Sequence, residues 1–71
     1  MTKSEFLDTL HRRLTGLPPS EIDDVMADYA QHFADGVAAG RSEAEIAAAL
    51  GDPVRLAREL RAEVGLRRWE E

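Results

Sequence analysis

The sequence predicts an all-α domain of four helices, and three observations lead to this prediction. Apolar residues recur at steps of three and four along most of the chain, which is the spacing of one helix face. Glycine and proline divide the chain into four such segments. No segment alternates apolar and polar residues as a strand does. We expect helices near 3–15, 19–39, 43–50 and 53–64 in a compact bundle, with the long second helix at its centre.

The first helix begins at a capping box, in which the Thr2 hydroxyl and the Glu5 carboxylate satisfy free N–H groups of the first turn. Gly16 is expected to end this helix and to leave Leu17 free to fold back onto it. The apolar stripe between these ends consists of Phe6, Leu7, Leu10 and Leu14.

The second segment predicts the longest helix. Pro18 and Pro19 suit its start, because the N–H group that proline lacks would have no partner in a first turn. Gly36 falls within the last turns, and Gly40 is the predicted C-terminal cap. The apolar stripe of this helix consists of Ile22, Val25, Met26, Tyr29, Phe33 and Val37.

The third helix is short and begins at a second capping box, formed by Ser42 and Glu45. Gly51 is predicted to end it, and the fourth helix starts at once with Asp52 as its N-cap and Pro53 as its first residue. The buried faces consist of Ile46, Ala47 and Leu50 in the third helix, and of Val54, Ala57, Leu60 and Val64 in the fourth.

Composition excludes several classes of protein. Only 71 residues form the chain, which is too few for a deep cofactor cavity or a conventional enzyme fold. Cysteine is absent, so there is no disulfide framework and no thiolate metal site. The net charge of -5 disfavours nucleic acid as a partner. No apolar run approaches the roughly 18 residues of a membrane span, and the start lacks a signal peptide, so we expect a soluble intracellular domain.

Charge is divided unevenly along the chain. Between Leu14 and Gly40 there are five acids and no Lys or Arg, whereas the fourth helix carries Arg55, Arg58 and Arg61 at three-residue steps. These can be solvated faces, with Arg58 or Arg61 reaching the acidic helix through pairs that contribute about 0–1 kcal/mol each. They can instead form a polarised surface that orients a partner protein. The sequence favours solvated faces, and the three arginines are candidate partner-binding residues.

Asp28, His32 and Asp35 occur at i, i+4 and i+7, so they share one side of the second helix. Two carboxylates and an imidazole can hold a divalent cation, but metal sites normally gather ligands from several elements. We therefore predict a polar ridge, with no metal and no cofactor, and treat these residues as further candidates for partner binding. No nucleophile stands beside a base, and the serines are explained by helix starts, so we expect no enzyme.

Residues 42–64 also resemble the helix pair of a helix-turn-helix, in which Arg55, Arg58 and Arg61 could meet the major groove of DNA. The net charge, the early Pro53 and the lack of Ser, Asn or Gln for reading bases disfavour direct contact with nucleic acid. A DNA-binding domain formed by 42–64 remains the alternative to a purely structural helix pair.

Five short segments together resemble a known family. MTKSEFL at 1–7, LTGLP at 14–18, DYAQHF at 28–33, GRSEAEI at 40–46 and LGDP at 50–53 occur in this order. The run over about residues 2–64 resembles the bacterial HAAS domain, the helix-turn-helix-associated α-helical signalling domain.

The resemblance implies the cytoplasmic N-terminal domain of a bacterial membrane protein, with transmembrane helices downstream of it. Genes of such proteins typically neighbour one for a PadR-like transcription regulator, which the domain is thought to contact. The resemblance implies no enzymatic activity, no cofactor and no catalytic residue. Because this chain stops at Glu71 without a span, it is either an excised domain or a free-standing member.

We divide the chain into a helical domain at 1–65 and a tail at 66–71, the latter being the possible start of a linker toward a membrane. Arg67, Arg68 and Trp69 combine two cations and an indole, which suits a cytoplasmic membrane interface. The two glutamates that follow offset the arginines near an anionic leaflet. We expect membrane contact only through a downstream span, with no appreciable lipid binding by the isolated chain.

Overall fold

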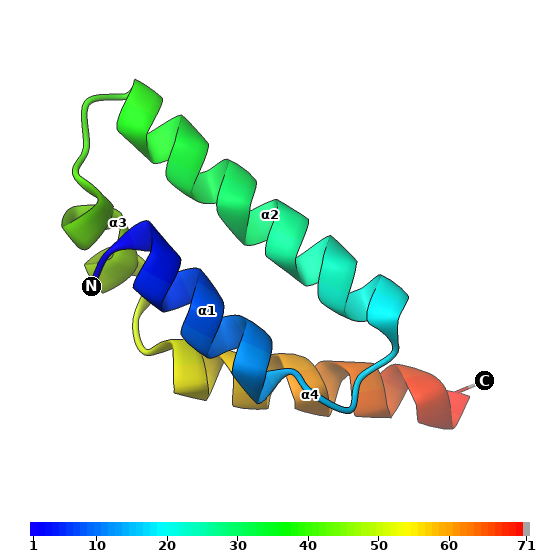
Figure 1. Ribbon diagram of the computed structural model, residues 1–71. Coiled ribbons are helices and arrows are strands. Elements are labelled where there is room, and N and C mark those ends of the chain that lie inside the picture. Colours follow the sequence, from blue (N-terminus) through cyan, green and yellow to red (C-terminus); the bar gives the residue numbers. More distant parts are fainter. Residues whose placement is uncertain (71) are drawn as a thin grey trace.

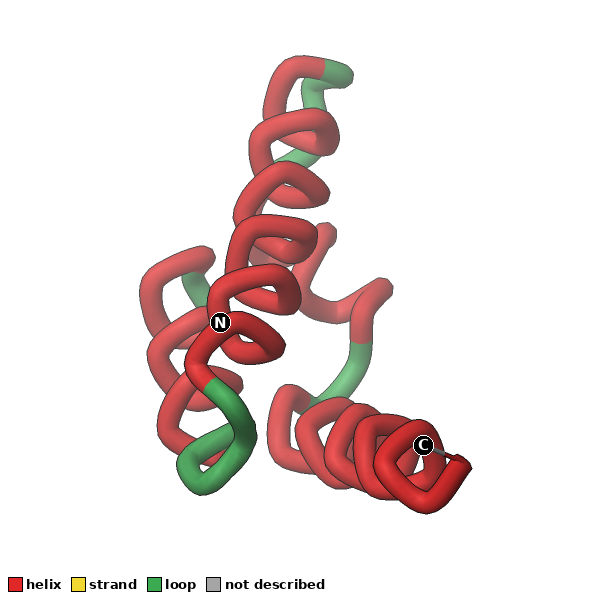
Figure 2. The backbone as a smooth tube through the Cα atoms, turned by 90° about the vertical axis from the view of Figure 1, so that its right-hand side faces the viewer, coloured by secondary structure: helices red, strands yellow, loops and turns green. Residues whose placement is uncertain are grey.

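The computed structural model describes the backbone of residues 1–70 and the side chains of residues 1–64. It contains four helices in chain order: α1 (Lys3–Arg13), α2 (Pro19–Ala38), α3 (Glu43–Leu50) and α4 (Pro53–Glu70) (Figure 1). Short loops join them, and the described backbone has no strand (Figure 2). The predicted all-α fold with a long second and a short third helix is confirmed.

Three helix ends differ from the prediction, that of α2 by a single residue, since it ends at Ala38. α1 ends at Arg13, two residues early, because Leu14 is its C-cap. α4 continues through Gly65 to Glu70, where an end at residue 64 was predicted. A glycine in a helix costs only about 1 kcal/mol relative to alanine, which does not end a helix unless the backbone also turns. The division at residue 65 stays a prediction, and the side chains of 66–71 lie outside the described residues.

The predicted N-caps are present, but only the first is a complete capping box, because Glu45 contacts the Ser42 hydroxyl and not its backbone N–H. Thr2 and Glu5 form both arms of the capping box: the Glu5 N–H donates to Thr2 Oγ1 at 3.2 Å, and the Thr2 N–H donates to Glu5 Oε1 at 3.0 Å. In α3 the Glu45 N–H donates to Ser42 Oγ at 3.1 Å, while the Ser42 hydroxyl donates to Glu45 Oε1 at 3.2 Å. Asp52 Oδ1 accepts from the N–H of Val54, the second residue of α4, at 2.9 Å. These local signals fix where the helices begin.

The predicted C-terminal cap of α2 is also present. Gly40 has a φ of +88°, which L side chains rarely adopt. Its N–H donates to the carbonyl oxygen of Val37, and the Arg41 N–H donates to that of Gly36, each at 3.0 Å. This is the Schellman pattern, which satisfies carbonyl groups that the helix end leaves without partners. Gly51 ends α3 with a φ of +91°.

α1, and not α2, is the central helix, so the prediction of a central second helix is wrong. α1 packs against α4, α2 and α3, and Figure 1 shows it next to both long helices. The helix and its C-cap also place three fully buried side chains in the core, those of Phe6, Leu10 and Leu14. α2 has only one buried residue along its length, because it is covered from one side. The length of a helix therefore did not indicate its place in the bundle. The shorter α1 is more deeply buried than α2, because it has neighbours on several sides.

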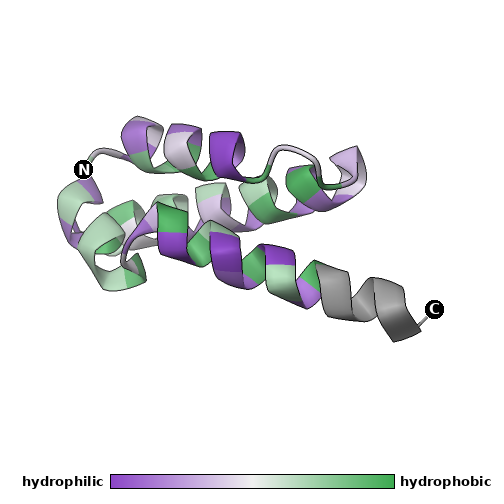
Figure 3. Cartoon of the chain, turned by 90° about the horizontal axis from the view of Figure 1, so that it is seen from below, coloured by the Kyte–Doolittle hydropathy of each residue, from purple (hydrophilic) through white to green (hydrophobic). Residues whose placement is uncertain are grey.

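The core lies where the apolar stripes meet, and Figure 3 shows the apolar side of α1 turned toward the other helices. The ring of Phe6 lies 5.4 Å from that of Phe33 and 6.3 Å from that of Tyr29, between centroids. Tyr29 and Leu50 are half-buried at its edge. The buried residues of the cluster are Phe6, Leu10, Leu14, Phe33, Ile46, Ala47 and Ala57. The predicted apolar stripes thus supply the core.

Val37 is the exception, since it was predicted to lie on the inner stripe and is 50% exposed. The reason lies one residue earlier. Gly36 occupies the inward position: a Cβ built on it would lie 2.5 Å from Cδ1 and 2.8 Å from Cγ1 of Ile46. Because successive residues turn by about 100° around a helix, the next residue points to solvent. The last turn of α2 approaches α3 through a glycine and not through a valine.

One hydrogen bond joins the starts of two helices that are distant in sequence. The Lys3 N–H donates to Glu43 Oε1 at 2.8 Å. Lys3 is the first residue of α1 and Glu43 the first of α3, so a carboxylate of one helix supplies a partner for a free N–H of the other. This contact fixes the two helix starts side by side.

Candidate functional site

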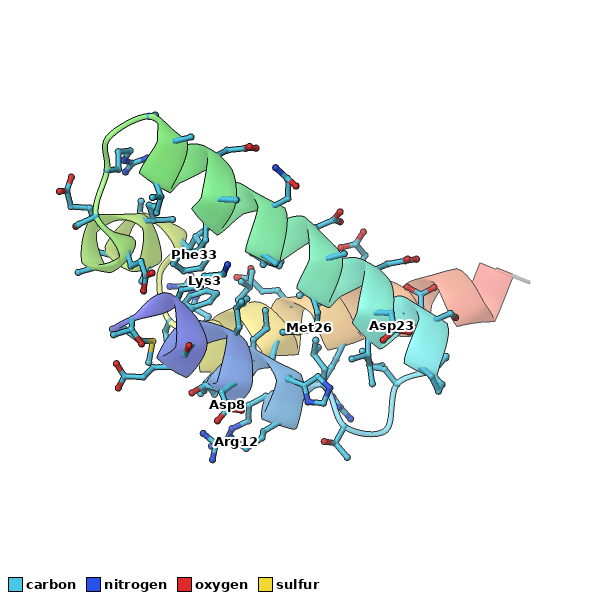
Figure 4. All side chains as sticks on the ribbon, turned by 45° about the horizontal axis from the view of Figure 1, so that its top comes forward. Lys3, Asp8, Arg12, Asp23, Met26 and Phe33 are labelled. Atoms are coloured by element: carbon cyan, nitrogen blue, oxygen red, sulfur yellow. The ribbon has the colours of Figure 1, made fainter. Side chains whose placement is uncertain are left out.

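The candidate residues on α2 form an open ridge. Asp28, His32 and Asp35 are all exposed, and Asp35 Oδ1 accepts from Gln31 Nε2 at 2.8 Å. Figure 4 shows Phe33 on the side of α2 that faces α1. Within the part of the chain that the structure describes, no three His, Asp or Glu side chains are placed to hold a metal ion. The ridge is a solvated acidic face.

The three candidate arginines of α4 do not act as one row. Arg55 pairs with Glu59 of its own helix, with Nε 3.6 Å from Oε1, and both side chains are largely exposed. Arg58 is exposed as well. Arg61 instead turns toward α1, and its Nη1 donates to the carbonyl oxygens of Arg13 at 3.2 Å and Thr15 at 2.7 Å.

The contact of Arg61 differs from the one considered in the sequence. One interpretation had Arg58 or Arg61 reaching the acidic helix, but Arg61 binds the carbonyl end of α1. The last carbonyl groups of a helix carry partial negative charge and have no partner within it, so a guanidinium is a suitable cap. Arg61 thereby fastens α4 to the end of α1 across 46 positions of sequence.

This contact helps to form a basic depression between α1 and α4. Arg13, Val54, Ala57, Arg58 and Arg61 line a hollow of about 250 Å³, which we call the arginine hollow. Ala57 is buried and Val54 half-buried, so the apolar lining lies deeper than the charges. Sequence reasoning missed Arg13 because only the pairing of α1 with α4 brings it beside the others. No local pattern could have indicated it.

Two further open grooves have a different character. A groove of about 550 Å³ between α1 and α2 has a mixed lining of Ser4, Glu5, Leu7, Asp8, His11 and Met26. His11 is exposed at the edge of α1. An Asp8–Arg12 pair, 3.9 Å between Oδ2 and Nε, lies on the same helix, as Figure 4 shows. Around Met1, a second groove of about 350 Å³ is lined mainly by alanines of α3 and by the start of α4.

Two ionisable groups in the described part of the chain, Glu5 and Tyr29, have shifted pKa values. The pKa of Glu5 is lowered, because its carboxylate accepts a backbone hydrogen bond from Thr2 and is also stabilised by the Thr2 side chain. The pKa of Tyr29 is raised by burial of its hydroxyl and by the nearby charges of Asp28, Glu59 and Glu63. Both shifts have structural causes within the helix cap and the edge of the core.

The described surface separates two kinds of charge. Among residues 1–64 no polar or charged side chain is buried. Acidic residues lie along α2, and arginines gather between α1 and α4.

The helix pair of the DNA-binding alternative has a short connection, since α3 and α4 are joined by two residues, Gly51 and Asp52. One face of α4 packs along α1, and Arg61 is bound to carbonyl groups at the end of that helix. This face of α4 is structural, while Arg55 and Arg58 are exposed. DNA binding by residues 42–64 stays the alternative.

Comparison with known proteins adds the family. A family model for the HAAS domain matches residues 5–59, from the first turn of α1 into α4. No curated protein and no solved structure matches the chain. In the described residues, no helix has the length and apolar character needed to cross a membrane. Four helices at the predicted places and a match over most of the chain lead to one conclusion: the chain belongs to the HAAS family.

Proposed function

We propose that this domain is a non-catalytic protein-interaction and signalling module. Its partner is a PadR-like transcription regulator, and its place is the cytoplasm, at the cytosolic face of the inner membrane where it forms part of a longer membrane protein. Membership of the HAAS family carries this proposal. The resemblance described above associates such domains with regulators of this kind.

The surface suits binding to a protein. Acidic residues cover α2, and arginines gather between α1 and α4. Complementary charge on a partner accelerates encounter, fixes orientation and rejects wrong partners. This role requires no catalysis by the domain, because binding to the partner or release from it can by itself transmit a signal.

A binding measurement with purified proteins tests the proposal. The domain is titrated by isothermal calorimetry into the PadR-like regulator that is encoded beside its gene. We expect saturable binding that weakens as salt rises, since exposed charges are screened. A folded domain, verified by circular dichroism, that gives no binding at low salt refutes the proposal. A DNA duplex titrated in parallel tests the alternative, which predicts affinity that falls steeply with salt and is lost in an Arg55/Arg58/Arg61 triple alanine variant.

A further inference from the structure

The arginine hollow contains cations that the rest of the domain does not neutralise. Among the described side chains, Arg13, Arg58 and Arg61 form no ion pair, whereas their neighbours Arg12 and Arg55 each pair with an acid on their own helix. No acid lines the hollow. The whole chain is acidic, with a net charge of -5, so this concentration of unpaired positive charge is local.

Arg61 gives the hollow a fixed guanidinium. Its Nη1 is held by two carbonyl oxygens of the end of α1. A guanidinium has five N–H donors in a rigid planar fork, so Nε and Nη2 retain donors for another acceptor. Because Arg61 is already ordered, binding to it loses less side-chain entropy than binding to a free arginine. Arg13 and Arg58 add two exposed cations to the lining.

The size and lining of the hollow limit what it binds. Pockets for small-molecule ligands commonly measure about 300–1,000 Å³ and enclose most of the ligand. The arginine hollow is smaller, about 250 Å³, and has charge at its rim and Val54 and Ala57 beneath. This shape suits one or two acidic side chains that project from a larger molecule, with their methylene groups against the apolar lining.

We propose that the arginine hollow binds carboxylates of an acidic segment on the partner protein. This inference rests on the proposed function, to which it adds the surface and the chemistry of the contact. A protein segment fits better than DNA, because a duplex carries a negative charge about every 1.7 Å and is repelled by a domain whose net charge is -5. A protein can present a few carboxylates to the hollow and different groups to α2.

A pair of matched double variants tests this assignment. Arg13→Gln/Arg58→Gln removes two charges from the hollow and leaves the Arg61 contact intact. Arg12→Gln/Arg55→Gln removes two charges from the same helices outside the hollow, so both variants have the same net charge. In calorimetry with the regulator at about 0.15 M NaCl, we expect the first variant to lose at least about tenfold in affinity and the second less than about threefold. Circular dichroism of both variants is the control for folding.

An independent probe separates this proposal from the proposed function. A glutamate-rich helical peptide is added to isotope-labelled domain, and the arginine Nε–H signals are followed by NMR. We expect saturable shifts at Arg58 and Arg61, and no such shifts with a lysine-rich peptide. If the regulator fails to bind but the acidic peptide shifts these signals, the proposed function is wrong and the hollow remains a carboxylate site.

Three results would overturn the assignment. Equal loss of regulator binding in the two double variants would mean that only total charge matters. Unchanged binding in the hollow variant would place the contact elsewhere and leave the proposed function standing. Saturable binding of a DNA duplex that is abolished by Arg13→Gln/Arg58→Gln would assign the hollow to phosphates.

Discussion

Replacing Gly36 by alanine sets two opposing effects against each other. Alanine in place of glycine within a helix stabilises it by about 1 kcal/mol. The added Cβ, however, would lie 2.5 Å from Cδ1 and 2.8 Å from Cγ1 of Ile46, well inside van der Waals contact. Ile46 is fully buried, so its side chain has no free space to move into. Helix preference therefore predicts that Gly36→Ala raises the free energy of unfolding, whereas the packing of α2 on α3 predicts that it lowers it.

The packing term is expected to be the larger one. Forcing an extra carbon into a well-packed core typically costs about 1–3 kcal/mol. After the gain in helix preference, Gly36→Ala should lower the free energy of unfolding by up to about 2 kcal/mol. For a domain of this size, that corresponds to a fall in melting temperature of up to about 15 °C. In an Ile46→Ala background the space is open, and the same substitution should raise stability by up to about 1 kcal/mol.

Urea unfolding followed by circular dichroism measures all four members of this cycle. A coupling of about 1–3 kcal/mol between the two positions is expected. Ala34→Gly, at an exposed site of α2, is the control that calibrates helix preference within this helix. If Gly36→Ala stabilises the otherwise unchanged domain by the full helix-preference term, then Ile46 yields freely and the close approach does not constrain the fold.

Three further outcomes are expected. Phe33→Ala should lower the free energy of unfolding in urea by about 3–5 kcal/mol, because the ring is fully buried. Val37→Ala removes a half-exposed side chain and should change it by less than about 1 kcal/mol. Similar losses in the two variants would refute the assignment of Phe33 to the core. Because the pKa of Glu5 is lower in the folded than in the unfolded domain, its ionised carboxylate stabilises the fold above the unfolded pKa, and this stability is lost as pH falls through the folded pKa. The melting temperature of the unchanged domain should therefore decline more steeply with acid than that of Thr2→Ala. Parallel curves would contradict the capping box. The raised pKa of Tyr29 should appear in an ultraviolet titration as ionisation above that of the urea-unfolded chain, with stability falling as pH rises through this range; coincident titrations would show that the hydroxyl is not desolvated.

The sequence predicted the helices well because their ends depend on short-range chemistry. Within each cap, at Thr2 and at Ser42, the contacting residues are three positions apart, so their contacts can be predicted without knowledge of the fold. The turn at Gly40 likewise involves only neighbouring residues. Gly65 misled for the same reason, because glycine permits a turn but does not impose one, and α4 continues past it.

Position in the bundle could not be predicted in this way. Burial depends on how many elements surround a helix, and neither the length nor the apolar stripe of α2 indicates that number. The arginine hollow has the same origin: Arg13 meets Arg58 and Arg61 only because α1 and α4 are adjacent. The candidate residues on α2 remain together as predicted, while the row on α4 divides into a helix-bound Arg55, a free-standing Arg58 and an anchored Arg61.

The central place of α1 has a consequence for biosynthesis. Its most extensive packing is with α4, the last of the four helices in chain order. Translation proceeds at about 5–20 residues per second, so roughly 3–10 s separate the synthesis of these two partners. During that interval Phe6, Leu10 and Leu14 lack the helix that completes their burial. The nascent domain therefore exposes its principal apolar surface until α4 has been synthesised, and it can fold as a unit only after that.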